Sequence, residues 1–400
     1  MLCGQPLRPD MTLSLGPLAA CNRFEFPGHA AIETHPLSVA QCGGCDLVQL
    51  SSFPPVEFVR PRVPWIRYNE PVAHLDALAE RLGGFFSTGE ASAIGVGPFD
   101  GPLLERMGKR GISCVELDLA ARVAAEQGRF PYLEAIQELL RPDILCAIAA
   151  EQGTADLVSC RYLIEHSHDP VAALQGLRHL VSENGVLLVE IPDSAKFLSN
   201  LDYSFIWEEH TCYFTEQTFR ASAFRAGYEV MNFFRYPGAL EDALVFMLRS
   251  RSPSIGRDVP AAAGEERDLF QRFRAGFENV RQRYIRAMDV IIACGRKAVI
   301  FGAGHQSIMF INALGLQRHV SFVIDDSPDK IGCLIPGTGI EIVSSEKLME
   351  DLAIGVCLLG VAPAVESKLR SKYAGYLDRG GRMVSIFPAA GTGTLIDPER

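Results

Sequence analysis

The sequence predicts an α/β protein with two doubly wound units, preceded by a small module rich in loops. Strand-like and helix-like segments alternate between residues 71 and 251, and the alternation restarts after a Pro/Ala/Gly-rich connection at 252–268. Residues 1–70 contain only short β-type runs among prolines and glycines. A chain of 400 residues is long enough for this organisation. We therefore expect domains at 1–70, 71–251 and 252–400.

Each unit follows from a series of apolar runs. In the first unit, buried strands are expected at 92–96, 112–118, 155–161 and 185–192, with helices at 72–82, 101–111, 169–181 and 215–227. An antiparallel pair at 228–238 and 243–250 closes it. In the second unit, a helix at 269–294 precedes strands at 297–301, 320–326, 356–362 and 382–387.

Composition and charge narrow the class of protein. Apolar residues make up 48% and charged residues 22%, as in a globular protein, and acidic residues (48) outnumber basic ones (38). The net charge of -10 repels phosphate backbones, so no nucleic-acid partner is expected. No apolar run reaches the roughly 18 residues of a membrane span, and the start lacks a signal-peptide layout. We therefore expect a cytoplasmic protein without a membrane partner.

Eleven cysteines in a reducing compartment are expected to be free thiols or metal ligands. Five of them lie in or beside apolar stretches and are predicted to be core residues: Cys114, Cys146, Cys160, Cys294 and Cys357.

A glycine loop follows the first strand of the central unit. Gly95, Gly97, Asp100 and Gly101 lie between that strand and a helix, where glycines let a ligand approach the backbone. Glu116 ends the next strand, 21 residues after Gly95, where a carboxylate can accept hydrogen bonds from both ribose hydroxyls. This order favours a nucleotide-type ligand. The alternative is a tight turn in an α/β domain that binds nothing.

The segment Trp207–Phe214 comes some twenty residues after the strand that ends at Pro192, so it is well placed to line a pocket at the carboxyl ends of the strands. His210 has a near-neutral intrinsic pKa, and Glu209 could hold or polarise it. The alternative is a loop histidine satisfied by a backbone carbonyl. His166 and His168 are predicted to be structural.

The turn Cys42-Gly43-Gly44-Cys45 suits a tetrahedral zinc site, because a reverse turn points both thiolates inward. Cys3 precedes a glycine as in a second such turn, and Cys21, His29 or His35 are candidates for a fourth ligand. A redox pair and an inert turn remain alternatives.

Two further segments carry chemistry. Gly302-Ala303-Gly304-His305 and the acid pair Asp325-Asp326 are typical of a nucleotide-binding turn, although a third glycine is absent. The strip from Arg60 to Pro71 is basic and aromatic, and either covers a pocket with rings and guanidiniums or forms a plain interdomain contact.

Together, these motifs resemble the three-domain C-methyltransferases that act on nucleotide-linked deoxy-keto sugars in bacterial antibiotic and cell-surface sugar pathways. The resemblance runs nearly end to end and is carried by the glycine loop and by the segments CGQPL, QCGGCDLVQL, RYLIEHSHDP, VEIPD, EEHTCYF and FGAGHQSIMFINALGL. It implies a small zinc-binding module, a central S-adenosylmethionine domain and a C-terminal Rossmann-like domain.

The resemblance also implies a role for each matching residue. His210 would be the catalytic base that removes a proton next to a ketone, with Glu209 and Trp207 beside it. The other implied sites are the cofactor residues Gly95, Gly97, Asp100, Gly101 and Glu116, the substrate residues Tyr68, Tyr213 and His305, and the zinc ligands Cys3, Cys42 and Cys45. Trp207 departs from the family, which usually has Tyr there, and Ala93 replaces a usual acid.

The expected function is therefore S-adenosylmethionine-dependent C-methylation of a small molecule, with a nucleotide-linked keto sugar as the expected acceptor and Zn²⁺ as a structural metal. The alternatives are an N- or O-methyltransferase of a small-molecule pathway, a non-catalytic binding protein with a decayed cofactor loop, and an NAD-dependent activity of the C-terminal glycine turn.

Overall fold

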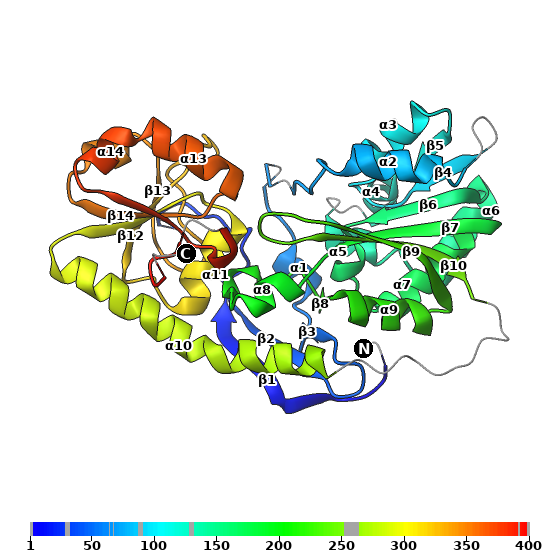
Figure 1. The fold of residues 1–400 in the computed structure, drawn as a ribbon, viewed down its shortest axis with the longest axis horizontal. Helices are drawn as coiled ribbons and strands as arrows, with labels where there is room; N and C mark the ends of the chain where they lie inside the picture. Colours follow the sequence, from blue (N-terminus) through cyan, green and yellow to red (C-terminus); the bar gives the residue numbers. More distant parts are fainter. Residues whose placement is uncertain are drawn as a thin grey trace.

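The computed structural model of the chain describes residues 3–28, 33–63, 65–66, 68–86, 91–127, 132–251, 264–390 and 393–397, with only the backbone at 125–127. Three β-sheets organise this part of the chain (Figure 1). Each sheet is built from strands of one continuous part of the chain, with one exception: the short strand β8 comes from the central part and joins the N-terminal sheet. The domain boundaries 1–70, 71–251 and 252–400 remain our proposal.

The N-terminal module is an antiparallel sheet of four strands. Their order is β1 (Leu7–Leu18), β2 (His35–Cys42), β3 (Val48–Leu50) and β8 (Cys212–Tyr213), and helix α1 (Val56–Val59) follows β3 in the chain. In β1, buried Met11, Leu13 and Leu15 alternate with more exposed residues, which is the period of a strand with one face on a core. Because β8 belongs to the segment Trp207–Phe214, this sheet holds that segment against the module.

The central sheet confirms the six predicted strands. Its order is β5 (Ser113–Glu116), β4 (Ser92–Gly95), β6 (Ala155–Arg161), β7 (Val181–Pro192), β10 (Ala243–Ser250) and β9 (Tyr228–Tyr236). The first four are parallel, and β10 runs antiparallel between β7 and β9. The chain leaves β4 toward β5 on one side and reaches β6 on the other, so a ligand crevice is expected at the carboxyl end of β4.

Helices cover both faces of this sheet (Figure 1). One face packs on α2 (Leu75–Gly83) and α3 (Gly101–Gly108). The other packs mainly on α5 (Leu133–Gln137), α6 (Pro142–Gln152), α7 (Pro170–Leu177) and α9 (Glu216–Arg225). Helix α4 (Leu119–Gln127) begins shortly after the carboxyl end of β5. The 3₁₀ turns η1 (Ile164–His166) and η2 (Arg178–Leu180) extend β6 and α7. The strands are therefore apolar on both sides, as their continuous hydrophobic runs require.

Two sequence predictions about burial are wrong. The run 112–118 was expected to be a buried strand, but β5 lies at the edge of the sheet and Val115 is 51% exposed. Cys146 on α6 and Cys294 at the end of α10 (Glu265–Ala293) are exposed, because they fall on the outward faces of their helices. Cys160 and Cys357 are buried in central strands as predicted.

The C-terminal unit is a parallel sheet of five strands. Their order is β13 (Ile342–Val343), β12 (Val320–Ile324), β11 (Lys297–Phe301), β14 (Ile354–Leu359) and β15 (Arg382–Ser385). Its helices are α11 (His305–Leu314), α12 (Lys347–Glu350), α13 (Pro363–Lys372) and α14 (Ala374–Asp378), and η4 (Pro388–Ala390) follows β15. The predicted long helix is α10, whose buried face includes Phe270, Phe273 and Tyr284.

One hydrophobic core joins the N-terminal module to the C-terminal unit. It contains Val39 of β2, Phe273 of α10 and Ile308 of α11. It also contains Trp207 and the residues of α8 (Ala195–Ser199) and η3 (Tyr203–Phe205). This shared core places the segment Trp207–Phe214 between the central sheet and α11. Within the described residues, no helix combines the length and apolar character needed to span a membrane.

Candidate active site

A cavity of about 420 Å³ lies at the carboxyl ends of β4 and β5. Its walls come from the glycine loop, the end of β5, the start of α4 and one residue of α5: Val96, Gly97, Pro98, Glu116, Leu117, Asp118, Leu119, Ala120 and Ile136. Its volume is within the range of small-molecule sites. Two of the five predicted cofactor residues, Gly97 and Glu116, therefore line this cavity, whereas Gly95, Asp100 and Gly101 do not.

The loop glycines have a steric reason. A Cβ on Gly95 would lie 2.7 Å from the Cβ of Asp100, and one on Gly97 would lie 3.3 Å from the carbonyl oxygen of Arg161. A Cβ on Gly101 would lie 3.3 Å from Oε2 of Glu116. The separation at Gly95 is too short for a side chain without a shift of its surroundings, whereas those at Gly97 and Gly101 are tight and require the neighbouring group to move by a few tenths of an ångström.

Asp100 takes a different part from the direct cofactor contact that the resemblance implied. The side chain is fully buried, and its Oδ2 accepts hydrogen bonds from the backbone N–H groups of Val96 (3.1 Å) and Gly97 (2.7 Å). Ser159 donates to Oδ1 at 2.5 Å. Burial raises the pKa of Asp100 to about 6, against the effect of these hydrogen bonds. We therefore assign Asp100 to positioning the loop.

A buried ion pair, which sequence reasoning missed, supports the same loop. Arg161, the last residue of β6, donates from Nε to Oε2 of Glu190 on β7 at 2.5 Å. Its Nη1 donates to the carbonyl oxygen of Phe99, and Nε2 of His74 lies 2.8 Å from Oε1 of Glu190. Arg161 thus ties the glycine loop to the ends of two strands.

A second cavity, of about 340 Å³, lies where the three units meet. It is lined by residues 21–24 of the module, the strip after Trp65, the loop containing Trp207, and the start of α11: Cys21, Asn22, Phe24, Trp65, Ile66, Tyr68, Asn69, Trp207, Glu209, Ala303, Gly304, His305, Ser327 and Lys330. We call it the acceptor cavity. It brings together Tyr68, Trp207, Glu209 and His305, four of the residues expected at the site.

The loop containing Trp207 is closed by Tyr213. The hydroxyl of Tyr213 accepts from the backbone N–H of Trp207 and donates to its carbonyl oxygen, both at 2.9 Å. Tyr213 is buried, and burial raises its pKa above its ordinary value. We therefore assign Tyr213 to holding the loop, instead of the substrate contact that the resemblance implied.

Glu209 is 1% exposed, and its carboxylate accepts hydrogen bonds from Tyr68 and Asn22. The Tyr68 hydroxyl donates at 2.8 Å to Oε2, and Nδ2 of Asn22 donates at 3.1 Å to Oε1. Burial, followed by the charges of Glu134 and Glu208, raises the pKa of Glu209 well above its ordinary value. The sequence expected Glu209 to hold His210, but the structure gives its oxygens to Tyr68 and Asn22.

His210 is half-buried and lies behind the wall of the acceptor cavity. Its ring centroid is 4.8 Å from that of Trp207 and 4.7 Å from that of His166, which it meets edge-on. Burial, and then the neighbouring imidazoles of His166 and His305, lower the pKa of His210 well below 6.5. The imidazole is therefore neutral at physiological pH and able to accept a proton.

His166 is buried against His210, and its pairing with Glu134 is consistent with its prediction as a structural histidine. It lies at the end of η1, and its Nδ1 is 3.3 Å from Oε1 of Glu134 on α5. The second oxygen of Glu134 is buried and has no partner among the described residues. The feature of the sequence that places His166 near His210 is its position just beyond the carboxyl end of β6. His168 points elsewhere and stacks on Phe53 at 4.4 Å.

The C-terminal unit contributes His305, the first residue of α11. Its ring stacks on Trp207 with centroids 4.6 Å apart and planes 17° apart, and burial lowers its pKa to about 4. The indole Nε1 of Trp207 is buried and has no partner among the described residues. It is therefore an unsatisfied buried donor on a residue that lines the acceptor cavity.

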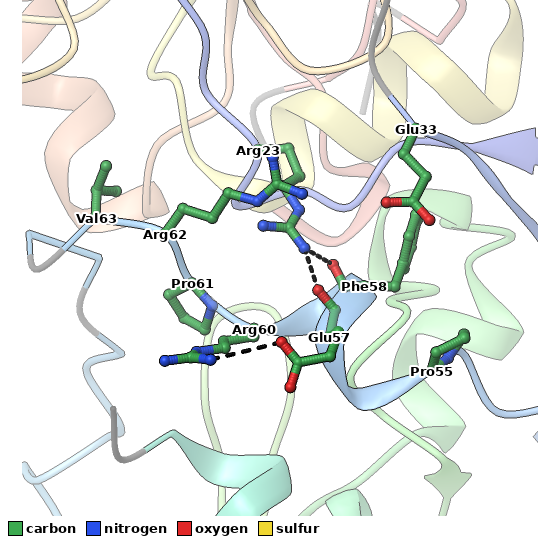
Figure 2. Close-up of a pocket in the computed structure, with 9 residues that line it drawn as sticks. All are labelled: Arg23, Glu33, Pro55, Glu57, Phe58, Arg60, Pro61, Arg62 and Val63. Atoms are coloured by element: carbon green, nitrogen blue, oxygen red, sulfur yellow. Dashed lines mark hydrogen bonds and ion pairs between the residues drawn. The ribbon is translucent and has the colours of Figure 1, made fainter. Parts of the chain in front are cut away.

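The strip that begins at Arg60 lines two cavities. Trp65, Ile66 and Tyr68 line the acceptor cavity, whereas 60–63 line a third cavity of about 560 Å³ (Figure 2). The strip therefore covers pockets, as one of the two sequence alternatives proposed.

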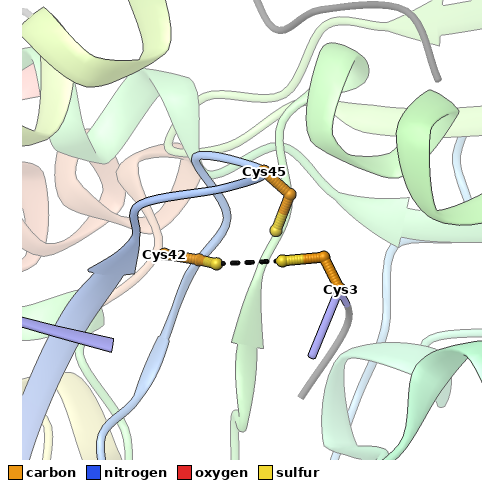
Figure 3. A group of neighbouring side chains, drawn as sticks. All are labelled: Cys3, Cys42 and Cys45. Atoms are coloured by element: carbon orange, nitrogen blue, oxygen red, sulfur yellow. Dashed lines mark hydrogen bonds between the residues drawn. The ribbon is translucent and has the colours of Figure 1, made fainter. Parts of the chain in front are cut away.

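Three cysteines of the N-terminal module converge on one point (Figure 3). The Sγ atoms of Cys3 and Cys42 are 3.3 Å apart, and those of Cys3, Cys42 and Cys45 all lie within 4.8 Å of one another. A Cβ on Gly44 would lie 3.1 Å from the Cys3 sulfur, so the turn needs glycine there. Three thiols at these separations fit a zinc ion with a fourth position open.

Two candidates for the fourth zinc ligand are excluded by the β1–β2 hairpin. Cys42 ends β2 beside Leu7, while His35 begins β2 beside Leu18. At about 3.3 Å per residue, His35 is about 23 Å from Cys42. Cys21 follows the far end of β1 and donates its thiol to Glu208 at 3.4 Å. His29 lies outside the described residues.

Two family models match the chain. Residues 71–232 match the model described as a methyltransferase domain, and residues 259–388 match the C-methyltransferase C-terminal domain. The chain is also similar to the C-methyltransferase NovU of Streptomyces niveus, with 26% identity over 373 residues that cover 88% of this chain and 86% of that protein. These matches favour an enzyme over a non-catalytic binding protein.

Solved structures resemble parts of the chain more distantly. The magnesium protoporphyrin IX methyltransferase (ChlM) of Synechocystis PCC 6803, with bound SAH, is 15% identical over 44% of this chain and 82% of that chain, with a TM-score of 0.31. The mitomycin 7-O-methyltransferase MmcR is 16% identical over 44% and 54%, with a TM-score of 0.29. The fold described above rests on strand order, not on these low scores.

Proposed function

We propose, since the chain belongs to the S-adenosylmethionine-dependent C-methyltransferases, that its acceptor is a nucleotide-linked deoxy sugar methylated on the carbon next to a ketone. The observation that carries the proposal is the acceptor cavity beside an imidazole kept neutral by burial. A carbon acid needs such a base, whereas a methylated oxygen or nitrogen has its own lone pair.

The cavity at the carboxyl ends of β4 and β5, which we call the cofactor cavity, offers groups that S-adenosylmethionine can bind. Glu116 offers a carboxylate to the ribose hydroxyls, and Gly97 leaves the backbone open to the ligand. When bound, S-adenosylmethionine supplies an electrophilic methyl carbon. Asp100 keeps the loop closed through its buried hydrogen bonds.

We assign the proton transfer to His210. Its neutral imidazole takes the α-proton of the ketone, and the electrons of that C–H bond move into an enolate. The unpartnered Nε1–H of Trp207 is a donor for the enolate oxygen, in the position where the family usually has Tyr. The enolate carbon would then form its bond to the methyl carbon while the bond from that methyl carbon to the sulfur of the bound cofactor breaks, which would leave S-adenosylhomocysteine and a protonated His210.

Glu209 and Tyr68 have a supporting role in this proposal. The Tyr68 hydroxyl is fixed on the Glu209 carboxylate, and burial raises the pKa of Tyr68 well above its ordinary value. Tyr68 is therefore a neutral donor that shapes the acceptor cavity. His305 closes the opposite side by stacking on Trp207.

The test is product analysis. The full chain is incubated with S-adenosylmethionine carrying a ¹³C-labelled methyl group and with dTDP-, GDP- and CDP-linked 4-keto sugars. The proposal expects mass gain in one acceptor and an NMR signal for a methyl group on carbon. A label on oxygen or nitrogen in the product would overturn the assignment of carbon chemistry.

We further propose that Cys3, Cys42 and Cys45 hold a structural Zn²⁺. Three thiols from two segments of a small module support this, because such modules gain much of their stability from a metal. Elemental analysis of the purified chain should find one zinc per molecule, with loss in Cys45→Ser and no loss in Cys294→Ser, whose thiol is exposed. Zinc retained by Cys45→Ser would contradict the proposal.

We also propose that the chain acts in a reducing compartment, the expectation drawn from its eleven cysteines.

A further inference from the structure

The third cavity is lined by three arginines and lies apart from the reacting groups (Figure 2). It has a volume of about 560 Å³. Its walls are Arg23, Glu33, the residues around α1 and the start of the basic strip: Pro55, Glu57, Phe58, Arg60, Pro61, Arg62 and Val63. We call it the arginine pocket. The proposed chemistry uses none of these residues.

Arg23 is the central feature of the arginine pocket. It is 4% exposed, and its Nη2 donates to the carbonyl oxygens of Glu57 (2.5 Å) and Phe58 (2.6 Å). Its Nε and Nη1 are buried and have no hydrogen-bond partner among the described residues. Two buried N–H donors of a charged group without acceptors are costly, so a ligand that supplies acceptors would be stabilised there.

The other two arginines add positive charge around Arg23. Burial lowers the pKa of Arg23, and the neighbouring charge of Arg62 lowers it further. Three carboxylates act on this pKa in the opposite direction: those of Glu33, Glu25 and Glu57. Arg62 is exposed at the mouth of the pocket, and Arg60 is held only by a 3.5 Å contact with Glu57. Two guanidiniums that repel each other favour an anion that binds between them.

The arginine pocket and the acceptor cavity share two chain segments. Arg23 lines the pocket, while its neighbours Asn22 and Phe24 line the acceptor cavity. Likewise, Val63 lines the pocket and Trp65 lines the acceptor cavity. Both segments therefore pass from one cavity to the other within about two residues, or about 7 Å. One extended ligand can reach both.

We propose that the arginine pocket binds the diphosphate of the nucleotide that carries the acceptor sugar. This inference rests on the proposed function, because it takes the group in the acceptor cavity to be a nucleotide-linked sugar. A diphosphate supplies several acceptor oxygens to Arg23 and Arg62, which is the geometry that guanidinium groups match best. Glu33 offers acceptor oxygens to a hydroxyl or N–H of the nucleoside.

The net negative charge of the chain makes a local group of arginines necessary for binding an anionic acceptor. The net charge of -10 opposes the approach of a diphosphate, so a dianionic acceptor needs a local concentration of positive charge. Lys330, on the wall of the acceptor cavity, is engaged with the carbonyl oxygen of Ala303 and with Asp325. Arg23, by contrast, keeps two cationic nitrogens, Nε and Nη1, without an acceptor among the described residues.

The experiment is calorimetric titration of the full chain with dTDP, UDP, GDP and CDP, with the matching nucleosides and inorganic pyrophosphate as comparisons. We expect one diphosphate to bind at least about tenfold more tightly than its nucleoside. Arg62→Gln should weaken that diphosphate about tenfold and leave the nucleoside unchanged. Arg23→Gln should weaken it more, provided its thermal unfolding matches the wild type.

The matched control is Arg318→Gln, an exposed arginine of the C-terminal unit, which should bind the diphosphate as the wild type does. S-adenosylmethionine affinity should be the same in all variants. Diphosphates that bind no more tightly than nucleosides, or equally tightly to Arg62→Gln, would overturn this inference and leave carbon methylation standing. Diphosphate binding through Arg62 in a protein that methylates no ketone would overturn the proposed function alone.

Discussion

At the residue scale, His210 combines partial exposure with a pKa well below 6.5. Replacing it by alanine removes the proposed base without touching the cofactor cavity. We expect His210→Ala to lower kcat about a hundred- to ten-thousand-fold. The affinity for S-adenosylmethionine, measured by calorimetry, should stay at the wild-type value.

Two further measurements decide whether His210 is the base. His168→Ala is the matched control, since its ring stacks on Phe53 away from Trp207, and it should keep the wild-type kcat. Because the pKa of His210 is lowered in the free protein, the acid limb of the kcat/KM profile should lie well below pH 6.5. An acid limb at or above that value, or a fully active His210→Ala, would refute the assignment.

The buried carboxyl group of Glu208 should make the free energy of unfolding depend on pH. Burial raises its pKa to about 7, and it accepts a 2.5 Å hydrogen bond from the backbone N–H of Cys21. A raised pKa means that the folded state binds this proton more tightly than the unfolded state. The resulting stabilisation is complete below the ordinary pKa of 4.5 and is lost as the pH rises through 7. The shift corresponds to about 3 kcal/mol.

Glu208→Gln removes this titration and keeps an oxygen for Cys21. We therefore expect thermal unfolding of Glu208→Gln a few degrees above the wild type at about pH 8.5, and close to it at about pH 4, below the ordinary pKa of the carboxyl group. The measurement is calorimetry or fluorescence at both pH values. A difference in Tm that does not depend on pH would show that Glu208 does not titrate in this range.

Some of these residues could be predicted from the sequence and others could not. Gly97 and Glu116 follow from motif spacing, because each lies at or beside the end of a predicted strand, whereas His210 was selected through the resemblance of its segment. Glu134 lies on α5, far from His166 in the chain, and no local pattern pairs them. The resemblance assigned Tyr213 to the substrate. Its hydrogen bonds to the backbone of Trp207 could not be predicted from the sequence, because they depend on how the loop closes.

At the element scale, the turn between β4 and α3 depends on one buried carboxylate. Asp100 accepts two loop N–H groups and the Ser159 hydroxyl, so Asp100→Ala leaves two buried donors unpaired. We expect the affinity for S-adenosylmethionine to fall at least about tenfold, measured by calorimetry. Asp100→Asn keeps one acceptor oxygen and should give an intermediate loss.

The control for this turn is Asp143→Ala, which removes an exposed carboxylate paired with Arg141 on α6. It should bind S-adenosylmethionine as the wild type does. Wild-type affinity in Asp100→Ala would mean that the loop closes without its carboxylate and that the proposed positioning role is wrong.

The elements themselves were mostly predictable, because apolar periodicity fixes strands and helices locally. Periodicity does not say where a strand lies in its sheet, so β5 was expected to be buried and is an edge. It also cannot predict β8, whose two residues pair with β3 from more than 160 positions away. That pairing brings Trp207 to the N-terminal module.

At the scale of the whole molecule, the acceptor cavity exists only because three units pack together. The sequence predicted two doubly wound units and a small module, but not the shared core that joins the module to the C-terminal unit. His305 was placed in the site by resemblance alone. Its stacking on Trp207 depends on contacts between residues about one hundred positions apart.

This assembly can be followed by intrinsic fluorescence. The chain has two tryptophans, and both Trp65 and Trp207 line the acceptor cavity. Binding of a dTDP-linked 4-keto sugar should therefore change tryptophan emission. S-adenosylmethionine alone should change it little, since its cavity is lined by residues of the glycine loop, β5 and the nearby helices.

The last prediction uses this signal to test the contribution of the C-terminal unit. His305→Ala removes a ring that stacks on Trp207 at 4.6 Å, so the free protein should already emit differently and bind the keto sugar about tenfold more weakly. His179→Ala, an exposed histidine of η2, is the control and should match the wild type. If His305→Ala binds the sugar normally and only its emission differs, the C-terminal unit supports the fold of the cavity without holding the acceptor.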